Sequence, residues 1–262
     1  MTRIDKVMAA RKAAGKKAIF IYITAGAPDI PTTIEAVKRA EAAGADVIEL
    51  GLPFSDPMAD GPVIQTASVV ALKNGMTLAK ELDLIREIRK FSDIPLIGMG
   101  YINNMYHYGF EKFVEDFKAA GMDGVIIPDV PHEESGDLRR IAAAHDFVLA
   151  EFITPGTTAV RMEEICQDAS GFIYCVSNNG VTGVKKVDYS TIGAVCDTAR
   201  NYTRTPLAVG FGIGSSEAAV AAAAHADAVI VGSAVVKELL AGKLDEAAQL
   251  IADMREALDK SY

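Results

Sequence analysis

Residues 19–51, IFIYITAGAPDIPTTIEAVKRAEAAGADVIELG, hold the pattern that decides the fold of this chain. Two short apolar runs, IFIYIT (19–24) and DVIELG (46–51), flank a helical segment predicted over 33–43 and ended by Gly44. Both runs are largely apolar on both alternations, which is typical of parallel strands buried on both faces. The stretch therefore predicts one strand–helix–strand unit.

The same alternation continues outward along nearly the whole chain. Six further strands are predicted at PLIGMGY (95–101), DGVIIPD (123–129), FVLAEFI (147–153), FIYCVS (172–177), PLAVG (206–210) and AVIVG (228–232). Further helices are predicted over 78–90, 110–120, 133–144, 158–168, 189–200, 216–224 and 245–258. Eight strand–helix units predict an α/β fold, a (β/α)₈ TIM barrel, with an open doubly wound sheet as the alternative architecture.

Length and composition agree with this fold. The chain has 262 residues, of which 50% are hydrophobic and 23% charged, and one such barrel takes about 250 residues. No linker divides the chain, so we expect residues 1–262 to form a single domain. An N-terminal helix near 3–13 is expected to close the barrel's bottom, and the insertions 52–76 and 177–188 are expected at its C-terminal mouth.

Charge and motifs exclude several classes of function. The net charge of −9 argues against a general binder of nucleic acid or of anionic membranes, although it allows a local anion site. No apolar run approaches the roughly 18 residues of a membrane span, and the N-terminal stretch is not expected to be a secretory signal. Three widely spaced cysteines fit a reducing cytoplasm, and four histidines show no metal-ligand spacing.

Glycine-rich loops follow the seventh and eighth predicted strands. GFGIGSS (210–216) opens one helix and VGS (231–233) opens the next. Backbone N–H groups at helix N-termini form anion sites, and this position in a barrel is a recurrent phosphate cradle. The glycines could also serve only as tight turns. Because no complete dinucleotide or P-loop fingerprint occurs, the pattern favours a phosphorylated small substrate over a nucleotide cofactor.

Glu49 is the acid that strand alternation singles out. In DVIELG, Val47, Glu49 and Gly51 share one face, and an outward Glu49 would be buried under helices without water. The inward choice places the carboxyl near the mouth, where desolvation raises its pKa and favours catalysis. An ion-paired core glutamate is the alternative, yet no Lys or Arg falls inside any predicted strand.

Asp60 and several strand-end residues are more ambiguous. Asp60 precedes Gly61-Pro62 and could simply cap a helix. Apolar residues at strand ends could line a pocket or belong to the core. The sixth strand has no lysine for a Schiff base, and convergent metal ligands are lacking, which leaves carboxylate acid/base chemistry on a phosphorylated substrate.

At ELGLPFSDPMADGP (49–62) the sequence strongly resembles the tryptophan synthase alpha subunit family. Matching segments follow in order along the chain: YITAG (22–26), DVPHEES (129–135), SNNGVTG (177–183), GFGI (210–213) and VGSAVVK (231–237). The family cleaves indole-3-glycerol phosphate to indole and glyceraldehyde 3-phosphate by a retro-aldol reaction. The resemblance implies this reaction, in tryptophan biosynthesis, with no cofactor in this chain.

The resemblance also implies roles for individual residues. Glu49 matches the principal acid/base carboxylate, Asp60 the group that hydrogen-bonds the indole N–H, and Tyr174 an active-site tyrosine. Thr182 matches a loop threonine that positions Asp60. The phosphate cradle is matched by Gly183, Gly212, Gly232 and Ser233. The indole pocket is matched by Tyr22, Met99, Tyr101, Asp129 and Ile153.

Two positions depart from the family pattern. Tyr22 stands where phenylalanine is frequent, and Asn178-Asn179 replaces the Arg-Ser of some members. Neither touches the acid/base pair. The loop 177–188 is expected to be a lid that orders over substrate, with Thr182 reaching Asp60.

A partner is implied as well: a tryptophan synthase beta subunit that carries pyridoxal phosphate, in a heterotetramer of two alpha and two beta chains. The loop 52–62 is stiffened by prolines and carries Phe54 and Met58, which suits an interface. Both side chains could instead pack inward as a lid. The predicted contacts are Pro53, Phe54 and Asp56. The alternatives are a free-standing lyase, a sugar-phosphate isomerase or epimerase, and a non-catalytic barrel that activates a partner.

Overall fold

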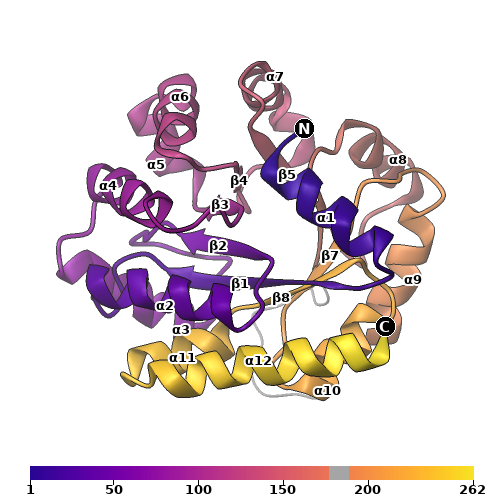
Figure 1. Cartoon of the computed structure of the whole chain (residues 1–262). Helices are drawn as coiled ribbons and strands as arrows, with labels where there is room; N and C mark the ends of the chain where they lie inside the picture. Colours follow the sequence, from indigo (N-terminus) through magenta and orange to yellow (C-terminus); the bar gives the residue numbers. More distant parts are fainter. Residues whose placement is uncertain (177–188) are drawn as a thin grey trace.

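A computed structural model describes residues 1–176 and 189–262 and shows a closed barrel of parallel strands (Figure 1). The strands are β1 (Ala18–Thr24), β2 (Val47–Gly51), β3 (Leu96–Met99), β4 (Gly124–Ile126), β5 (Val148–Ile153), β6 (Ile173–Val176), β7 (Leu207–Gly210) and β8 (Ala228–Val231). Each strand pairs with its neighbour in sequence, and β8 closes the ring onto β1. The predicted TIM barrel is confirmed, and the open sheet is excluded.

Helices surround the strands in the order that the sequence predicts (Figure 1). They are α1 (Arg3–Ala13), α2 (Ile30–Ala42), α3 (Pro62–Lys73), α4 (Leu78–Arg89), α5 (Ile102–Tyr108), α6 (Phe110–Ala120), α7 (Gly136–Ala144), α8 (Ala159–Asp168), α9 (Tyr189–Ala199), α10 (Ser216–Ala223), α11 (Ser233–Leu240) and α12 (Leu244–Ser261). A short 3₁₀ turn, η1 (His132–Glu134), precedes α7. None of these described helices combines the length and apolar character needed to cross a membrane.

Helices α2, α3 and α5 differ from the sequence prediction. α2 begins three residues earlier than predicted, because the Asp29 side chain accepts a hydrogen bond from the Thr32 N–H at 2.7 Å and Pro31 fits the first turn. The insertion 52–76 contains the regular helix α3, which Pro62 begins. α5 was not predicted, because INNMYHY is short and has few apolar residues to mark a buried face.

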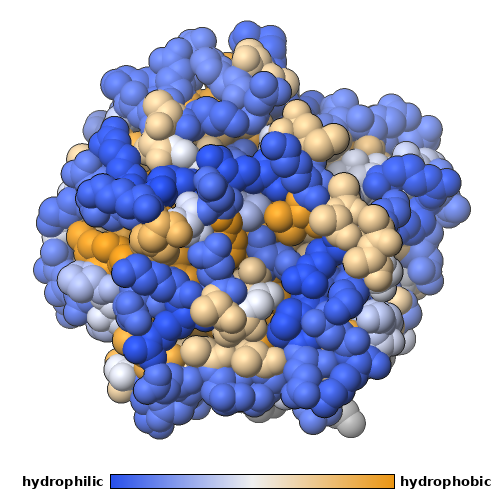
Figure 2. Space-filling view, viewed as in Figure 1, coloured by the Kyte–Doolittle hydropathy of each residue, from blue (hydrophilic) through white to orange (hydrophobic). Residues whose placement is uncertain are grey.

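The barrel interior is filled from below by α1, which crosses the end of the barrel that faces the viewer in Figure 1. Ile4 and Met8 of α1 join the interior cluster, where Phe20 and Phe172 meet edge to face at 5.1 Å between ring centroids. Hydrophilic residues cover most of this end (Figure 2). Closure at the bottom leaves the C-terminal mouth as the open end of the barrel.

Three aspartates tie neighbouring strands together at the closed end. Asp46, Asp123 and Asp227 precede β2, β4 and β8, and each accepts a backbone N–H from the adjacent odd-numbered strand at 2.8–2.9 Å. Arg3 and Arg11 of α1 pair with Asp123 and Asp46 at 3.0 and 2.6 Å. The carboxylates at this end are therefore structural, which separates them from those at the mouth.

Candidate active site

β2 places Glu49 inside the barrel near its mouth. Glu49 is paired with Tyr22 of β1 and Ile97 of β3, and it is only 2% exposed. Its Oε2 has no hydrogen-bond partner among the described residues. Burial, with a smaller contribution from the charge of Asp60, raises the pKa of Glu49 to about 8. The carboxyl is therefore protonated at neutral pH and free to give up its proton.

A second strand glutamate, Glu151 of β5, provides a contrast. Its side chain lies on the outer face of the barrel, where Arg139 Nη1 is 3.4 Å from Oε1 and His132 Nδ1 is 3.2 Å from Oε2. Arg139 comes from α7 and His132 from η1. A search for Lys and Arg within the predicted strands therefore could not find them. In the described part of the chain no such ion pair involves Glu49, which separates a structural glutamate from a reactive one.

Asp60 lies on the loop before α3 and is 5% exposed. The N-cap of α3 is Gly61, without a side-chain cap, so Asp60 is not the capping residue that its sequence context allowed. The Tyr101 hydroxyl accepts the Ala59 N–H at 3.0 Å and donates to the Asp60 carboxylate. Burial raises the pKa of Asp60 to about 6, and the bond from Tyr101 opposes that rise.

Two tyrosines lean against glycines on the next strand. A Cβ built on Gly51 would lie 2.0 Å from the Tyr22 hydroxyl oxygen, and one on Gly210 would lie 2.2 Å from that of Tyr174. Burial, followed by the charges of nearby carboxylates, raises the pKa of both phenols well above their usual value. Both hydroxyls therefore stay neutral beside the two acids.

The loops after β7 and β8 have the form expected of an anion site. Gly212 has a φ of +76°, which favours glycine. Gly232 is the N-cap of α11 and makes no side-chain cap bond, so the N–H groups at Ser233 and beyond lack that acceptor. A Cβ on Gly232 would meet the Tyr22 Cβ at 3.5 Å, so this helix start adjoins the pocket wall. Gly183, Thr182 and the predicted lid lie outside the described residues.

The remaining predicted pocket residues are placed differently from one another. Met99 packs against the barrel interior, and Asp129 accepts the Ile102 N–H at 3.0 Å, which starts α5. Ile153 lies on the outer face of β5 and is fully buried against the helices, whereas Phe152 points inward and packs on Tyr174 at 5.3 Å. The wall residue on β5 is thus Phe152, which the alternation of Val148, Ala150 and Phe152 could have indicated.

The loop 53–60 spans the mouth beside Asp60. Pro53 is buried, Phe54 is half-buried and stacks on Tyr101 at 5.1 Å, and Asp56 is exposed. Met58 is 76% exposed, so its side chain does not pack inward as a lid. Phe54 packs on the Tyr101 ring, whose hydroxyl contacts Asp60. A movement of this loop would therefore also move the Asp60 carboxyl.

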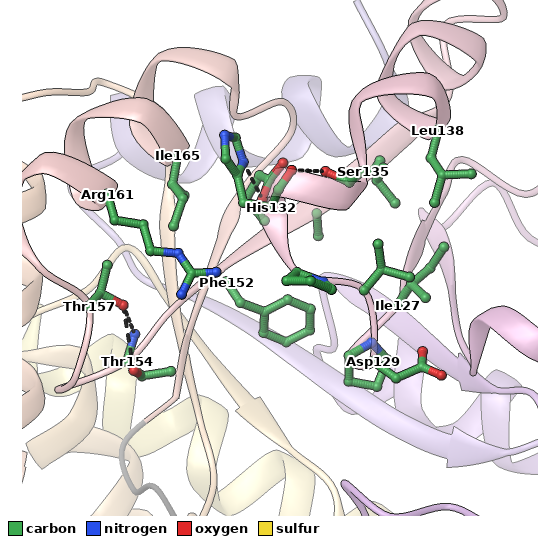
Figure 3. Close-up of a pocket in the computed structure, with 16 residues that line it drawn as sticks. Ile127, Asp129, His132, Ser135, Leu138, Phe152, Thr154, Thr157, Arg161 and Ile165 are labelled. Carbon is green, nitrogen blue, oxygen red and sulfur yellow. Dashed lines mark hydrogen bonds and ion pairs between the residues drawn. The ribbon is translucent and has the colours of Figure 1, made fainter.

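A side cavity of about 280 Å³ adjoins the mouth between the ends of β4 and β5 (Figure 3). Figure 3 shows Asp129 at one end, Phe152 at the centre and the Arg161 guanidinium at the opposite end. His132 is buried in the wall of this cavity beside Glu151. No group of three or more His, Cys, Asp or Glu within residues 1–176 and 189–262 is arranged to hold a metal ion.

Comparison with known proteins gives one consistent result. The model of the family described as tryptophan synthase alpha chain matches residues 8–261. The tryptophan synthase alpha chain of Caldanaerobacter subterraneus is 41% identical over 98% of this chain and all of its own length. The crystal structure of the alpha subunit from Legionella pneumophila superposes with a TM-score of 0.91 at 36% identity and covers 99% of both chains. A tryptophan synthase structure from M. tuberculosis, in an aminoacrylate-bound form, gives 0.89 at 27% identity, over 98% of this chain and all of the other.

Proposed function

The chain belongs to the tryptophan synthase alpha chain family, and we propose that Glu49 and Asp60 carry out its reaction. It is a carbon–carbon lyase that cleaves indole-3-glycerol phosphate to indole and glyceraldehyde 3-phosphate in L-tryptophan biosynthesis. One observation carries the assignment of roles: two buried carboxyls at the mouth have pKa values of about 8 and about 6. Separated pKa values of this kind assign one acid and one anion at neutral pH.

Glu49 acts first as the acid. Its carboxyl donates a proton to C3 of the indole ring, and the ring becomes an indolenine cation that draws electrons toward its nitrogen. The C–C bond to the glycerol chain then breaks, and its electron pair restores the indole. The adjacent glycerol hydroxyl loses its proton to the Glu49 carboxylate and becomes the aldehyde, so the acid is regenerated.

Asp60 acts as the anion. An ionised carboxylate beside the indole N–H stabilises the positive charge that C3 protonation creates. Tyr101 fixes this carboxylate through its hydroxyl, and Tyr22 of β1 and Tyr174 of β6 supply neutral walls. Met99, Asp129 and the inward Phe152 complete the wall that faces the ring. Ile153 belongs to the outer packing.

The glycines after β7 and β8 hold the phosphate. Gly212 presents its backbone N–H from the loop before α10, Gly232 and Ser233 present theirs at the start of α11, and Gly183 and Thr182 are proposed to close over the substrate from the loop 177–188. Because Gly232 adjoins Tyr22, the phosphate and the ring can be bound at the same time. We place the protein, as a single domain, in the cytoplasm; its three cysteines are free and buried.

We also propose that this chain binds a beta subunit, in a heterotetramer of two alpha and two beta chains, through Pro53, Phe54 and Asp56. Phe54 stacks on Tyr101, which holds Asp60, so docking on this loop can reposition the carboxylate. Pyridoxal phosphate would be held by that partner and would supply the chemistry that consumes indole. The exposure of Met58 on the same loop supports a contact surface there.

Indole release from indole-3-glycerol phosphate, measured on the purified chain, tests the reaction. Indole formation with equimolar glyceraldehyde 3-phosphate supports it, and turnover of a sugar phosphate without indole would favour an isomerase. Adding a beta subunit from a relative should raise the rate and co-elute with the chain. A flat titration without co-elution would instead indicate a free-standing lyase.

A further inference from the structure

The closed end of the barrel, opposite the candidate active site, has a cleft lined by basic side chains. Its volume is about 190 Å³, and it lies where the end of α1 meets the beginnings of β1, β7 and β8. The basic residues that line it are Arg11, Lys12, Lys16, Lys17 and Arg204. We propose that this cleft binds a small organic phosphate, at a site separate from the substrate phosphate.

The backbone brings these cations together from distant parts of the chain. Gly15 has a φ of +69° and ends α1, so that Lys16 and Lys17 follow a sharp reversal beneath the barrel. Lys17 immediately precedes β1, and Arg204 lies on the connection from α9 to β7, nearly two hundred residues away. A ligand in the cleft would therefore contact both the end of α1 and the connection from α9 to β7, which the fold brings together at this end of the barrel.

The local charge is positive although the protein is acidic overall. In the described part of the chain, seven cations in and around the cleft share three carboxylates. Arg11 and Arg255 contact Asp46, Lys16 and Arg255 contact Asp259, and Arg200 contacts Asp227. The set of seven is completed by Lys12, Lys17 and Arg204. Although the whole chain has a net charge of −9, the local excess of cations makes this region attractive to anions.

Three of these cations form no ion pair in the described structure, although Asp227, which also lines the cleft, partly offsets the effect of burial on the pKa of Lys17. Arg204 donates to the carbonyl of Arg200 at 3.3 Å, and Lys17 donates to the carbonyl of Ala226 at 2.8 Å. Lys12 is exposed at the rim, without an ion pair among the described residues. Because burial lowers the pKa of Lys17, an anion placed beside it would stabilise its charged form.

The shape of the cleft limits the class of ligand. Its floor is apolar, since Met8 belongs to the barrel interior cluster and Pro206 lies beside it. A drug-sized ligand needs a pocket of about 300 Å³ or more, so a nucleotide does not fit. A phosphate ester with a short carbon chain matches both the basic rim and the apolar floor.

Amide chemical shifts can separate this site from the active site. In a titration with glycerol 3-phosphate, the Gly15 N–H reports the cleft and the Gly232 N–H reports the phosphate cradle. We expect both signals to move, with different midpoints. The Gly15 response should weaken by about tenfold in the double variant Lys12→Ala/Arg204→Ala, while the Gly232 response is unchanged.

Arg86→Ala/Lys90→Ala is the matched control, because it removes two exposed cations, one in α4 and one at its C-cap, and alters the net charge equally. This variant should keep the wild-type response at Gly15. The proposal is overturned if glycerol 3-phosphate leaves Gly15 unmoved, if chloride moves it to the same extent, or if both double variants weaken it alike. None of these results depends on indole release, so the active-site assignment is tested separately.

Discussion

Glu49 and Tyr22 occupy paired positions on β2 and β1, and both side chains face the barrel interior. The phenol is held over Gly51, two residues beyond Glu49 on the same face, and the charges of Glu49 and Asp60 act on it, so the expectation that Tyr22 does not bear on the acid/base pair was wrong. The Glu49 Oε2 has no hydrogen-bond partner among the described residues. An acid buried in this way keeps its proton until a substrate supplies an acceptor.

Replacing Glu49 should abolish turnover without abolishing binding. Glu49→Gln preserves size and removes the proton donor, so kcat should fall by about 10²–10⁴-fold while glycerol phosphate still binds. Glu151→Gln is the control, because Glu151 is equally buried but paired with Arg139 and His132. It should keep kcat within a few fold and lose about 1–3 kcal/mol of stability. Equal losses of kcat in both variants would remove the distinction between the two acids.

The pH profile of kcat/KM should be bell-shaped. Catalysis requires an ionised Asp60 and a protonated Glu49, so activity should rise with pH through about 6 and fall through about 8. Asp60→Asn should remove the acidic limb and lower the maximum rate. A profile that is flat from pH 5 to 9, with chemistry shown to limit the rate, would contradict these protonation states.

Tyr101 should tune Asp60. Its hydroxyl donates to the Asp60 carboxylate and so lowers the carboxyl pKa, and Tyr101→Phe should move the acidic limb toward higher pH. Tyr106→Phe is the control, since the Tyr106 side chain is 78% exposed and is not one of the groups that bond to Asp60. If the limb stays in place in Tyr101→Phe, the hydrogen bond does not set the ionisation of Asp60.

Gly212 should be needed for phosphate binding. Gly212→Val introduces a branched side chain at a φ of +76°, where it both strains the loop and obstructs N–H groups. Gly242→Val has nearly the same φ, +73°, in open space away from the mouth, so it reproduces the strain alone. Calorimetry with glycerol 3-phosphate should show weaker binding only for the first variant, and Gly232→Val should resemble it.

Glu81 should make stability depend on pH. This carboxyl of α4 is buried with an unpartnered Oε2, and burial raises its pKa to about 8 from an ordinary value near 4.5. Its contribution to stability is present below pH 4.5 and is lost as the pH rises through 8, because the folded state resists ionisation. Glu81→Gln should therefore gain relative stability between pH 5 and pH 8, by about 1 kcal/mol or more, in urea titrations. A gain that does not change with pH would show that ionisation is not the cause.

Much of the architecture could be predicted because strands buried on both faces leave long apolar runs in the sequence. The inward direction of Glu49 followed from the alternation of DVIELG, since the outer face offered no water. Glu151 could not be classified in this way, because its partner Arg139 comes from a helix and only folding brings them together. Asp60 likewise depends on Tyr101, which lies forty-one residues away.

Within the site, the errors have local causes. Ile153 was predicted from its place near a strand end and from the family resemblance, whereas the structure places it on the outer face of β5, next to the inward Phe152. α5 carries too few apolar residues for its periodicity to be seen, yet its start is where Asp129 binds. Short polar helices at a mouth are fixed by tertiary contacts rather than by pattern.

Gly51 and Gly210, which face Tyr22 and Tyr174, leave the space that the two phenol rings occupy. They therefore set how wide the barrel interior is at this level. Each glycine leaves room for a phenol ring directly against its backbone, and the two glycines belong to strand pairs in different parts of the barrel, β1–β2 and β6–β7. One added methyl at Gly51 or Gly210 would swing a ring of six carbons into the space that a planar substrate must enter. These two glycines thus set the size of substrate that the barrel can admit. A change of substrate size in this protein would begin with them.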